Sequence, residues 1–372
     1  MTKSATRVAA DKVTFTQAEV TAKDTAARAG RKNLIINGAM QVAQRGTSFT
    51  GLTSGQHYVS DRFENQLSSA GTFTFDNTNI APDGFSNSQR MNCTTAFSVA
   101  SGTYLIFRHD IEGQNLQEAA FGTSAAKQMT LSFWCRSTKT GSLSVVVRQP
   151  DASNRMFSKN VTINTANTWE KKTILIPADT GGTINNDNGS GLQVAWWLNG
   201  GSTYGGGSEQ TAWGTQTHTN KYTGTINLGA STSDQFYLTG VQLEVGSVAT
   251  DFEHRSYGEI LADCQRYFYQ DTTNHYRPSF LDGSGNYPTV FVEHPVPMRA
   301  TATGAFLQVS DFYYNHNGSG FTNFTPNSSS VSWNGDNKGG SFRYNAISNG
   351  QGAGKAMIVG IWYTRLKFNA EL

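Results

Sequence analysis

One stretch of the sequence combines ring-bearing and uncharged polar side chains in a way that suits the recognition of sugars. It is the loop from Asn199 to Thr223, which contains the run STYGGGSEQTAWGTQTHTNKY. Sugars present flat C–H faces that pack on tyrosine and tryptophan rings, while Asn, Gln, Ser and Thr side chains hydrogen-bond to hydroxyl groups. Five residues of this loop and of the preceding segment are therefore candidate glycan contacts: Trp197, Tyr204, Trp213, His218 and Tyr222.

A structural role is the alternative for each of these residues. Trp213 and Tyr222 could hold the loop down or pack on a neighbouring subunit. Trp196 and Trp197 are adjacent in an expected strand, so their side chains must point to opposite faces of the sheet. At most one of the two belongs to the core, and the other must be covered by the loop, a subunit or a ligand. The same choice arises near the C-terminus for Tyr313, Tyr314, Trp333 and Tyr344.

Carboxylate pairs, which glycoside hydrolysis would require, are a second chemical possibility. Asp110 and Glu112 stand two residues apart, and so do Asp251 and Glu253, which places each pair on one face of a strand. Nothing in the sequence distinguishes these pairs from solvated residues on an outer face. We therefore expect the chain not to be an enzyme.

Metal sites and charged partners find little support in the composition. The 7 histidines show no metal-binding spacing, and the 3 cysteines are far apart and are expected to be free thiols, so we expect no metal and no cofactor. A net charge of +2 does not favour nucleic-acid binding.

Asp61, Arg62 and Glu64 predict a local ion-pair cluster at a strand end. No run of about 20 apolar residues predicts membrane insertion, and no signal peptide is evident, so folding in a cytosol is expected.

Period-two apolar patterns predict that the chain is all-β from residue 33 to residue 255. The expected strands are at 33–44, 103–111, 128–136, 142–149, 170–177, 192–199 and 235–245. Short strands with hardly any helix between them are typical of an antiparallel β-sandwich or jelly roll. The alternation slips at Gly240, which predicts a β-bulge there.

A short helix is expected after this domain, over residues 256–270. Ser256 and Glu259 form a capping box, and apolar residues recur on one face. These residues are Ile260, Leu261, Cys264, Tyr267 and Phe268. Strand patterns and turn clusters resume after the helix, so a smaller C-terminal β-sandwich is expected over 271–372.

The N-terminal segment, residues 1–32, predicts a helix near 17–29. Thr16 and Glu19 form a capping box, and Gly30 suits the C-terminal end. The helix offers mainly small apolar residues, chiefly Ala18, Ala22, Ala26 and Ala29. Such a helix is marginal alone, so we expect it to pack on copies of itself or on another protein; a solvated tail is the alternative.

Three passages resemble a family of bacteriophage virion proteins of the tail-fibre type. They are NLIINGAMQVAQRGTSF from residue 33 with SDRF at residue 60, the passage over 236–268, and HPVPMRATAT at 294–303. The resemblance implies a jelly roll like that of carbohydrate-binding modules, a C-terminal β domain and a homotrimer. It also implies that the linking helix lies near the three-fold axis. The expected trimer contacts are Ile260, Leu261, Cys264 and Phe268.

One position departs from the resemblance. Carbohydrate-binding modules of this type often have an acidic pair that helps to hold calcium, and here Thr239 and Gly240 stand in its place. Calcium needs several oxygen ligands, so no metal is carried over.

The expected function is therefore a virion fibre or spike subunit that binds host surface glycans, with the N-terminal arm binding other virion proteins. The alternatives are a purely structural virion component, such as a fibre-base connector or head decoration, and a glycan hydrolase or esterase.

Overall fold

The computed structural model describes residues 31–271, 275–281, 288–306, 312–315, 322–324, 331–344, 356–361 and 366–372. The expected N-terminal helix, with Ala18, Ala22, Ala26 and Ala29, lies outside these residues. The side chains of Tyr313, Tyr314 and Tyr344 also lie outside the described part.

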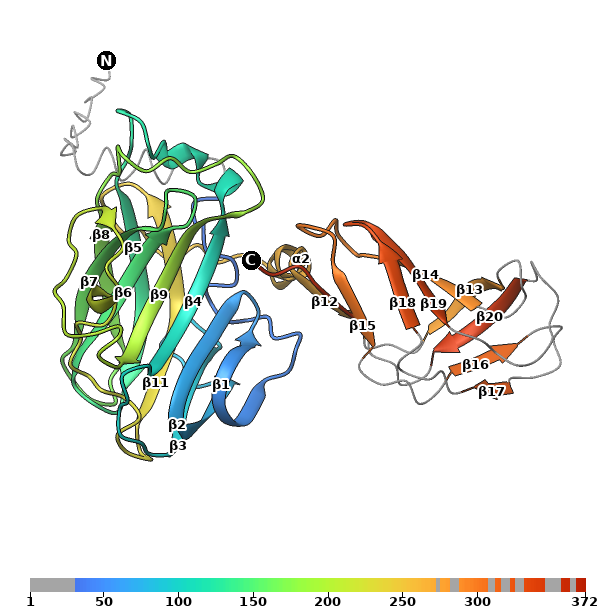
Figure 1. The fold of residues 1–372 in the computed structure, drawn as a ribbon, viewed down its shortest axis with the longest axis horizontal. Helices are drawn as coiled ribbons and strands as arrows, with labels where there is room; N and C mark the ends of the chain where they lie inside the picture. Colours follow the sequence, from blue (N-terminus) through green and yellow to red (C-terminus); the bar gives the residue numbers. More distant parts are fainter. Residues whose placement is uncertain are drawn as a thin grey trace, which may run out of the picture.

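The first part of the chain is built on one eleven-stranded antiparallel sheet (Figure 1). Its strands are β1 (Ser48–Ser60), β2 (Phe63–Thr78), β3 (Ser88–Thr95), β4 (Tyr104–Glu112), β5 (Met129–Ser137), β6 (Gly141–Gln149), β7 (Arg155–Ile163), β8 (Glu170–Ile176), β9 (Ser190–Gly200), β10 (Gly214–Thr215) and β11 (Gln235–Val245). The strand order is β10-β7-β6-β9-β4-β2-β3-β11-β5-β8, and β1 pairs with β2. The mostly β architecture is confirmed, and six of the seven expected strands correspond to β4, β5, β6, β8, β9 and β11.

The sheet curls so that its two halves face each other across one core. The first residues of β2 pair with β4 and its later residues pair with β3, so this long strand belongs to both halves. Trp196 of β9 meets Phe133 of β5 with ring centroids 5.6 Å apart, and Phe107 of β4 meets Phe236 of β11 at 5.9 Å. These aromatic contacts join strands that are not neighbours in the sheet, and they close the core.

The strand expected at 33–44 is wrong, because this segment forms a buried series of turns. Asn37 and Met40 have φ values of 60° and 57°, which a strand does not allow. The Asn37 amide donates to the carbonyl oxygens of Val42 and Asp61, both at 2.9 Å, and this holds the turn. The apolar residues of the pattern are buried, but by a turn rather than by a strand.

The bulge expected at Gly240 is confirmed. The pairing of β11 with β5 shifts register between Thr239 and Gln242, and Gly240 has a φ of 59°. A Cβ atom at this position would lie 2.7 Å from the Phe85 ring. Glycine is therefore required by both the backbone conformation and the packing.

The helix α2 (Tyr257–Gln265) begins at the predicted capping box of Ser256 and Glu259. Ile260 and Cys264 are buried with Tyr267 against the turn segment that contains Ile36 and Val42. No helix in the described part of the chain is both long and apolar enough to cross a bilayer.

The residues expected at a trimer axis have partners within one chain. Ile260, Cys264 and Phe268 are buried by intramolecular packing, and Leu261 packs against the same cluster. The homotrimer remains a prediction, but these side chains are not an exposed apolar face.

The C-terminal part contains two smaller antiparallel sheets. The three-stranded sheet has the order β12-β21-β15, and the seven-stranded sheet has the order β17-β16-β20-β13-β14-β19-β18. The strands are β12 (Phe268–Asp271), β13 (His275–Leu281), β14 (Pro288–Glu293), β15 (Thr303–Phe306), β16 (Phe312–Asn315), β17 (Thr322–Phe324), β18 (Val331–Gly335), β19 (Gly339–Tyr344), β20 (Ala356–Ile361) and β21 (Leu366–Asn369). Trp333 packs with Phe342 and Phe368 inside this part, with ring centroids 4.6 and 5.0 Å away, so this aromatic residue belongs to a core.

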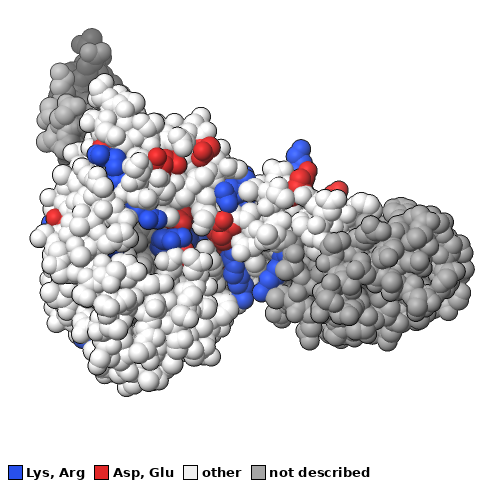
Figure 2. Space-filling model, in the orientation of Figure 1, with Lys and Arg blue, Asp and Glu red and all other residues white. Residues whose placement is uncertain are grey.

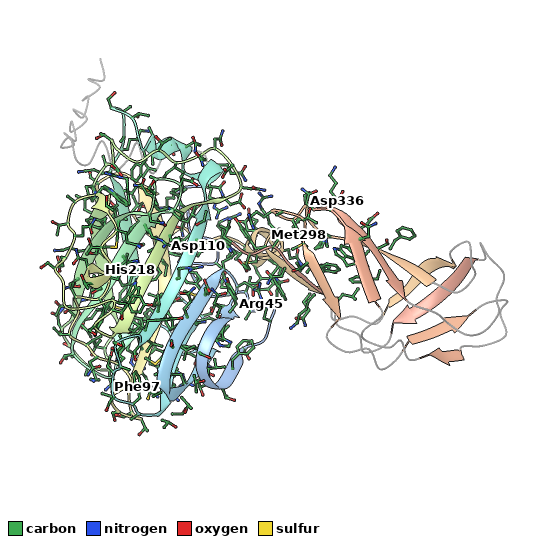
Figure 3. The ribbon with its side chains drawn as sticks, viewed as in Figure 1. Arg45, Phe97, Asp110, His218, Met298 and Asp336 are labelled. Carbon is green, nitrogen blue, oxygen red and sulfur yellow. The ribbon has the colours of Figure 1, made fainter. Side chains whose placement is uncertain are left out.

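The two parts meet at a buried polar joint. Arg62 stacks on Tyr267 at 3.5 Å and forms an ion pair with Glu371, close to the C-terminus. Arg45, which Figure 3 places on the side of the first part that faces the second, binds the same carboxylate at 3.0 Å. Arg299 donates to the carbonyl of Ala370 at 2.8 Å. The C-terminal residues are thus fixed against the first sheet.

The local ion-pair cluster expected from Asp61, Arg62 and Glu64 is wrong. Asp61 pairs with Arg45, and Glu64 pairs with Arg108. Asp61 and Arg62 form the turn between β1 and β2, where Arg62 has a φ of 71°, so these neighbours in the sequence reach different partners.

Candidate functional site

The site lies on the face of the first sheet that points away from the aromatic core. Along each strand, alternate side chains enter the core and the others form this outer face. Trp196 is 0% exposed in the core, whereas Trp197 lies on the outer face in a second apolar cluster with Ile106 and Val146. The prediction that the two tryptophans point to opposite faces is confirmed.

Strand register brings residues from distant parts of the sequence into one patch. Between β4 and β9, Ile106 pairs with Trp197 and Arg108 pairs with Ala195. Between β6 and β9, Val146 pairs with Ala195. The outer face therefore carries a continuous apolar floor across three adjacent strands.

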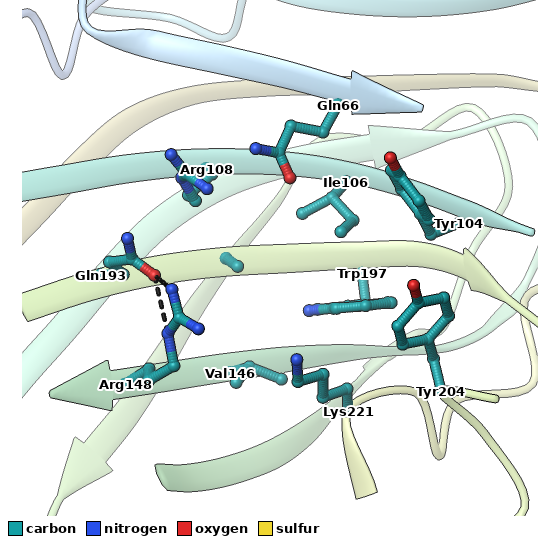
Figure 4. A pocket seen from close by; sticks show the side chains of 11 residues that line it. Gln66, Tyr104, Ile106, Arg108, Val146, Arg148, Gln193, Trp197, Tyr204 and Lys221 are labelled. Atoms are coloured by element: carbon teal, nitrogen blue, oxygen red, sulfur yellow. Dashed lines mark hydrogen bonds between the residues drawn. The ribbon is translucent and has the colours of Figure 1, made fainter. Parts of the chain in front are cut away.

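Above this floor lies an open groove of about 250 Å³ (Figure 4). Its apolar and aromatic lining consists of Tyr104, Ile106, Val146, Ala195, Trp197 and Tyr204. Its polar lining consists of Gln66, Arg108, Arg148, Gln193 and Lys221. The aromatic rings gather at one end and the guanidinium groups at the other, which gives the groove two chemically different ends.

The aromatic end is held by contacts among three rings. Tyr204 meets Tyr104 edge-on with centroids 5.7 Å apart and an angle of 89°, and it meets Trp197 at 5.3 Å. Trp197 is only 5% exposed, so it forms the floor, while the two tyrosines are half-buried and present surface to the groove. Together the tyrosines provide a surface for the C–H face of a sugar ring.

The loop that supplies Tyr204 and Lys221 is fixed at its base. The Tyr222 N–H donates to the Tyr204 carbonyl at 2.8 Å, and the Tyr222 hydroxyl accepts from the Asn227 N–H at 3.0 Å. A Cβ atom at Gly200 would lie 2.7 Å from the Tyr222 Cβ, so glycine allows the loop to lie directly on the sheet. Ligand-facing side chains on this loop are therefore presented from a rigid support.

The cationic end is built from two arginines, Arg108 and Arg148. The Arg148 guanidinium donates through Nε to the Gln193 Oε1 at 2.8 Å and also through Nη2. Arg108 forms ion pairs with Glu64 at 2.5 Å and Asp110 at 3.0 Å. Figure 2 shows basic and acidic atoms around the hollow over β4, β6 and β9.

Lys221 extends into the groove between the guanidinium of Arg148 and the aromatic end (Figure 4). Its ammonium lies 5.9 Å from the centroids of the Trp197 and Tyr204 rings. Burial, with a second contribution from the positive charge of Arg148, lowers the pKa of Lys221 to about 8. At neutral pH the side chain is still protonated, so the groove carries a third positive charge.

The carboxylates beside the groove lie beneath its surface. Asp110 and Glu64 are buried, and neither lines the groove. Burial raises the pKa of Asp110 to about 6, although Arg108 and Arg62 oppose this rise. Burial also raises the pKa of Glu64.

The expectation that Asp110 and Glu112 are solvated is wrong. Both are buried, and Glu112 forms an ion pair with Arg266 at 2.8 Å, at the end of α2. Both carboxylates lie on the same face of β4, as their spacing predicts. Near Glu112, the helix α2 and the C-terminal part cover that face.

Only some of the five predicted glycan contacts lie in the groove. Trp197 and Tyr204 line the groove. His218 does not line it, and its ring centroid lies 6.4 Å from that of Tyr204. Trp213 instead packs on Phe121 and donates its indole N–H to the Pro177 carbonyl at 2.7 Å.

Tyr222 is buried under the loop. Trp213 and Tyr222 therefore hold the loop down, which was the alternative interpretation. A role for either residue in binding stays a prediction.

Sequence reasoning missed most of the groove. Tyr104, Ile106 and Arg108 alternate along β4, and Val146 and Arg148 alternate along β6. The sequence did contain a signal for this groove. The outer faces of these strands carry aliphatic, aromatic and arginine side chains instead of small polar ones. Lys221 was visible only as one of two charged residues, with Glu209, in an otherwise uncharged loop.

No metal site is formed by the described side chains, among which no group of three His, Cys, Asp or Glu is close enough to share an ion. Where the calcium-associated acidic pair would stand, the Thr239 hydroxyl donates to the Asn87 carbonyl at 2.7 Å.

Comparisons with known proteins give similarity to solved structures only. The sequence matches no protein-family model, and it matches no curated protein. The enzymatically active domain of bacteriophage CBA120 tailspike protein 4 is similar over 57% of this chain, with 13% identity and a TM-score of 0.30. This chain covers only 21% of the length of that protein.

Two carbohydrate-binding modules give comparable values. A family 16 module aligns over 57% of this chain and 99% of its own length, at 12% identity and a TM-score of 0.28. A family 11 module from Clostridium thermocellum, solved in complex with a β-1,3-1,4-mixed-linked tetrasaccharide, aligns over 56% of this chain and 99% of its own length, at 9% identity and a TM-score of 0.28. Scores at this level carry no functional conclusion, which must come from the groove.

Proposed function

We propose that the groove binds a glycan, and that the chain is a non-enzymatic subunit of a bacteriophage fibre or spike that adheres to the host surface. The observation that carries the proposal is the open groove with Tyr104 and Tyr204 at one end and hydrogen-bonding side chains at the other. Aromatic surface beside a small number of fixed polar groups is the usual composition of a sugar site.

The polar lining suits hydroxyl groups. Gln66, Gln193 and Arg148 offer amide and guanidinium groups, of which Gln193 and Arg148 are already hydrogen-bonded to each other. The Gln66 amide donates to the Glu64 carboxylate at 2.8 Å, and this fixes its orientation. Side chains that are ordered before binding lose less conformational entropy when the ligand arrives.

The buried carboxylates support a binding role rather than hydrolysis. Catalysis by a carboxylate pair requires both groups to reach the scissile bond. Glu64 and Asp110 are both paired with Arg108 below the groove and do not line it. Release of reducing ends from a bound polysaccharide would contradict this part of the proposal.

The virion assignment rests on the resemblance of the three sequence passages to tail-fibre-type proteins. In a trimeric fibre, three grooves would act together, and avidity would compensate for weak single sites. Residues 1–32 would attach the chain to other virion proteins, and the groove would face the host. The purely structural alternative predicts attachment to the virion without any glycan binding.

The test is binding of the purified, labelled protein to intact cells of candidate hosts before and after mild periodate oxidation of their surface sugars. Loss of binding after oxidation supports glycan recognition. Binding that oxidation leaves unchanged contradicts it, and absence of binding to every permissive host favours the structural alternative.

A further inference from the structure

The charge lining the groove is unbalanced. Three basic residues, Arg108, Arg148 and Lys221, line it, and no carboxylate does among the residues that the structure describes around it. The whole chain has a net charge of only +2, so three cations in one small groove are a local concentration of positive charge.

Only one of these cations is neutralised by ion pairs. Arg108 binds Glu64 and Asp110, which lie on its buried side. These carboxylates therefore neutralise most of the positive charge of Arg108, and the side chain acts mainly as part of the wall of the groove.

Arg148 is bound by amides instead. Its guanidinium donates to Gln193 Oε1 and, at 3.5 Å, to Gln216 Oε1. Amide oxygens satisfy N–H groups but carry no formal charge. The ion pairs of Glu64 and Asp110 are made with Arg108. Burial and the charge of Arg108 lower the pKa of Arg148, and the Asp110 carboxylate beneath the groove only opposes this. Arg148 thus keeps a positive charge that faces the groove.

Lys221 is the third cation, and its contacts are with rings. Within the described residues its ammonium forms no ion pair, and it is held near the faces of Trp197 and Tyr204. Two partly buried cations that repel each other are unfavourable for folding, and Arg148 contributes to the lowered pKa of Lys221. An anion bound between them would remove this penalty.

We propose that the glycan bound in the groove is acidic, with its anionic group between Arg148 and Lys221 and a sugar face on Tyr104 and Tyr204. This inference rests on the proposed function and specifies its ligand class. A planar guanidinium and a compact ammonium both match the oxygens of a carboxylate, sulfate or phosphate. The shared chemistry is therefore a sugar that carries one of these groups.

Affinity electrophoresis in polysaccharide gels tests the proposal with the full-length protein. The acidic probes are polygalacturonate, alginate and hyaluronan for carboxylates, dextran sulfate for sulfates, and teichoic acid for phosphodiesters. The neutral probes are dextran, galactan and mannan, together with the carboxyl-reduced form of each uronate polymer. We expect retardation by at least one acidic probe and, for a uronate, loss of retardation after carboxyl reduction.

Three charge variants identify the groove as the site. Lys221→Gln and Arg148→Gln should each weaken retardation by the acidic probe about tenfold. Lys171, which is exposed on β8 at the far edge of the sheet, provides the matched control. Lys171→Gln removes the same charge from the chain and should change the affinity by less than about twofold.

The outcomes separate the two proposals. Equal binding of acidic and carboxyl-reduced probes, or of neutral probes alone, overturns the acidic ligand but leaves glycan binding intact. Binding of acidic probes that falls equally in all three variants overturns the placement of the anion in the groove. Failure to bind any probe or any host cell overturns both proposals.

Discussion

Arg62 and Glu371 form an ion pair although 309 residues separate them in the sequence. Arg62 is 2% exposed, and its guanidinium also donates to the carbonyl of Asp110 at 2.6 Å. Asp110 belongs to the strand that carries the wall of the groove. The joint between the two parts and the binding face of the first sheet are therefore connected through one strand, β4.

Loss of the Glu371 charge should destabilise the joint. Glu371→Gln leaves Arg62 buried without its carboxylate, and breaking a buried pair from one side costs about 3 to 5 kcal/mol. The free energy of unfolding, measured by urea titration, should therefore fall by about 3 to 5 kcal/mol.

The control for this variant is Glu118→Gln, which removes the carboxylate from the exposed ion pair between Glu118 and Lys127. Surface pairs contribute about 0 to 1 kcal/mol, so its effect should be small. Equal stabilities of the two variants would show that the joint does not depend on Glu371.

Removal of one tyrosine ring should weaken binding without unfolding the protein. Tyr204→Ala and Tyr104→Ala remove half-buried rings from the groove. A lost aromatic contact of about 0.5 to 1.5 kcal/mol reduces affinity roughly two- to tenfold. Isothermal titration with the polysaccharide identified in the gel assay measures this change.

Tyr257→Ala is the matched control, because Tyr257 is 56% exposed on α2. Its affinity should equal that of the wild type. If both groove variants bind as tightly as this control, the ligand does not contact the aromatic end.

Binding of an acidic glycan should weaken as the pH rises through the pKa of Lys221. That pKa is lowered to about 8 by burial and by Arg148, so the ammonium loses its charge above this value. Arginine guanidinium groups do not lose their proton in this pH range, and Lys221 lowers the pKa of His218, so neither residue type produces the same step.

The affinity for the acidic probe should fall about tenfold between pH 7 and pH 10, and the bound anion should shift the midpoint above the value for the free protein. Lys221→Gln should give a flat profile at low affinity. A profile that is unchanged by this substitution would exclude Lys221 as the titrating group.

Deletion of residues 1–30 should leave the β domains folded, because the chain is anchored immediately after them. The Asn33 N–H donates to Glu253 at 2.7 Å, and the Leu34 N–H donates to the Leu243 carbonyl at 2.9 Å. The melting temperature should stay unchanged, while incorporation into particles should be lost. Normal occupancy of the truncated chain in particles would contradict the attachment role of the N-terminal arm.

Local features of the fold could be predicted from the sequence. The bulge at Gly240, the capping box at Ser256 and the opposite orientations of Trp196 and Trp197 depend on residues only a few positions apart. The strand predicted at 33–44 is wrong because its apolar pattern fits a strand, while the left-handed Asn37 and Met40 are stabilised by contacts from elsewhere in the chain. Period-two patterning indicates which residues are buried, but it cannot tell how the backbone buries them.

The sequence by itself determined the β class, the faces of the strands and the aromatic loop, since these follow from backbone geometry and neighbouring residues. Only the tertiary structure decided that β6, β9, β4 and β2 are neighbours, and this order brings Arg108, Arg148 and Lys221 into one groove. It also decided that Trp213 faces the core and that Glu371 reaches Arg62. The physical reason is that strand order and the partners of buried charges depend on the packing of the whole chain, which no local pattern encodes.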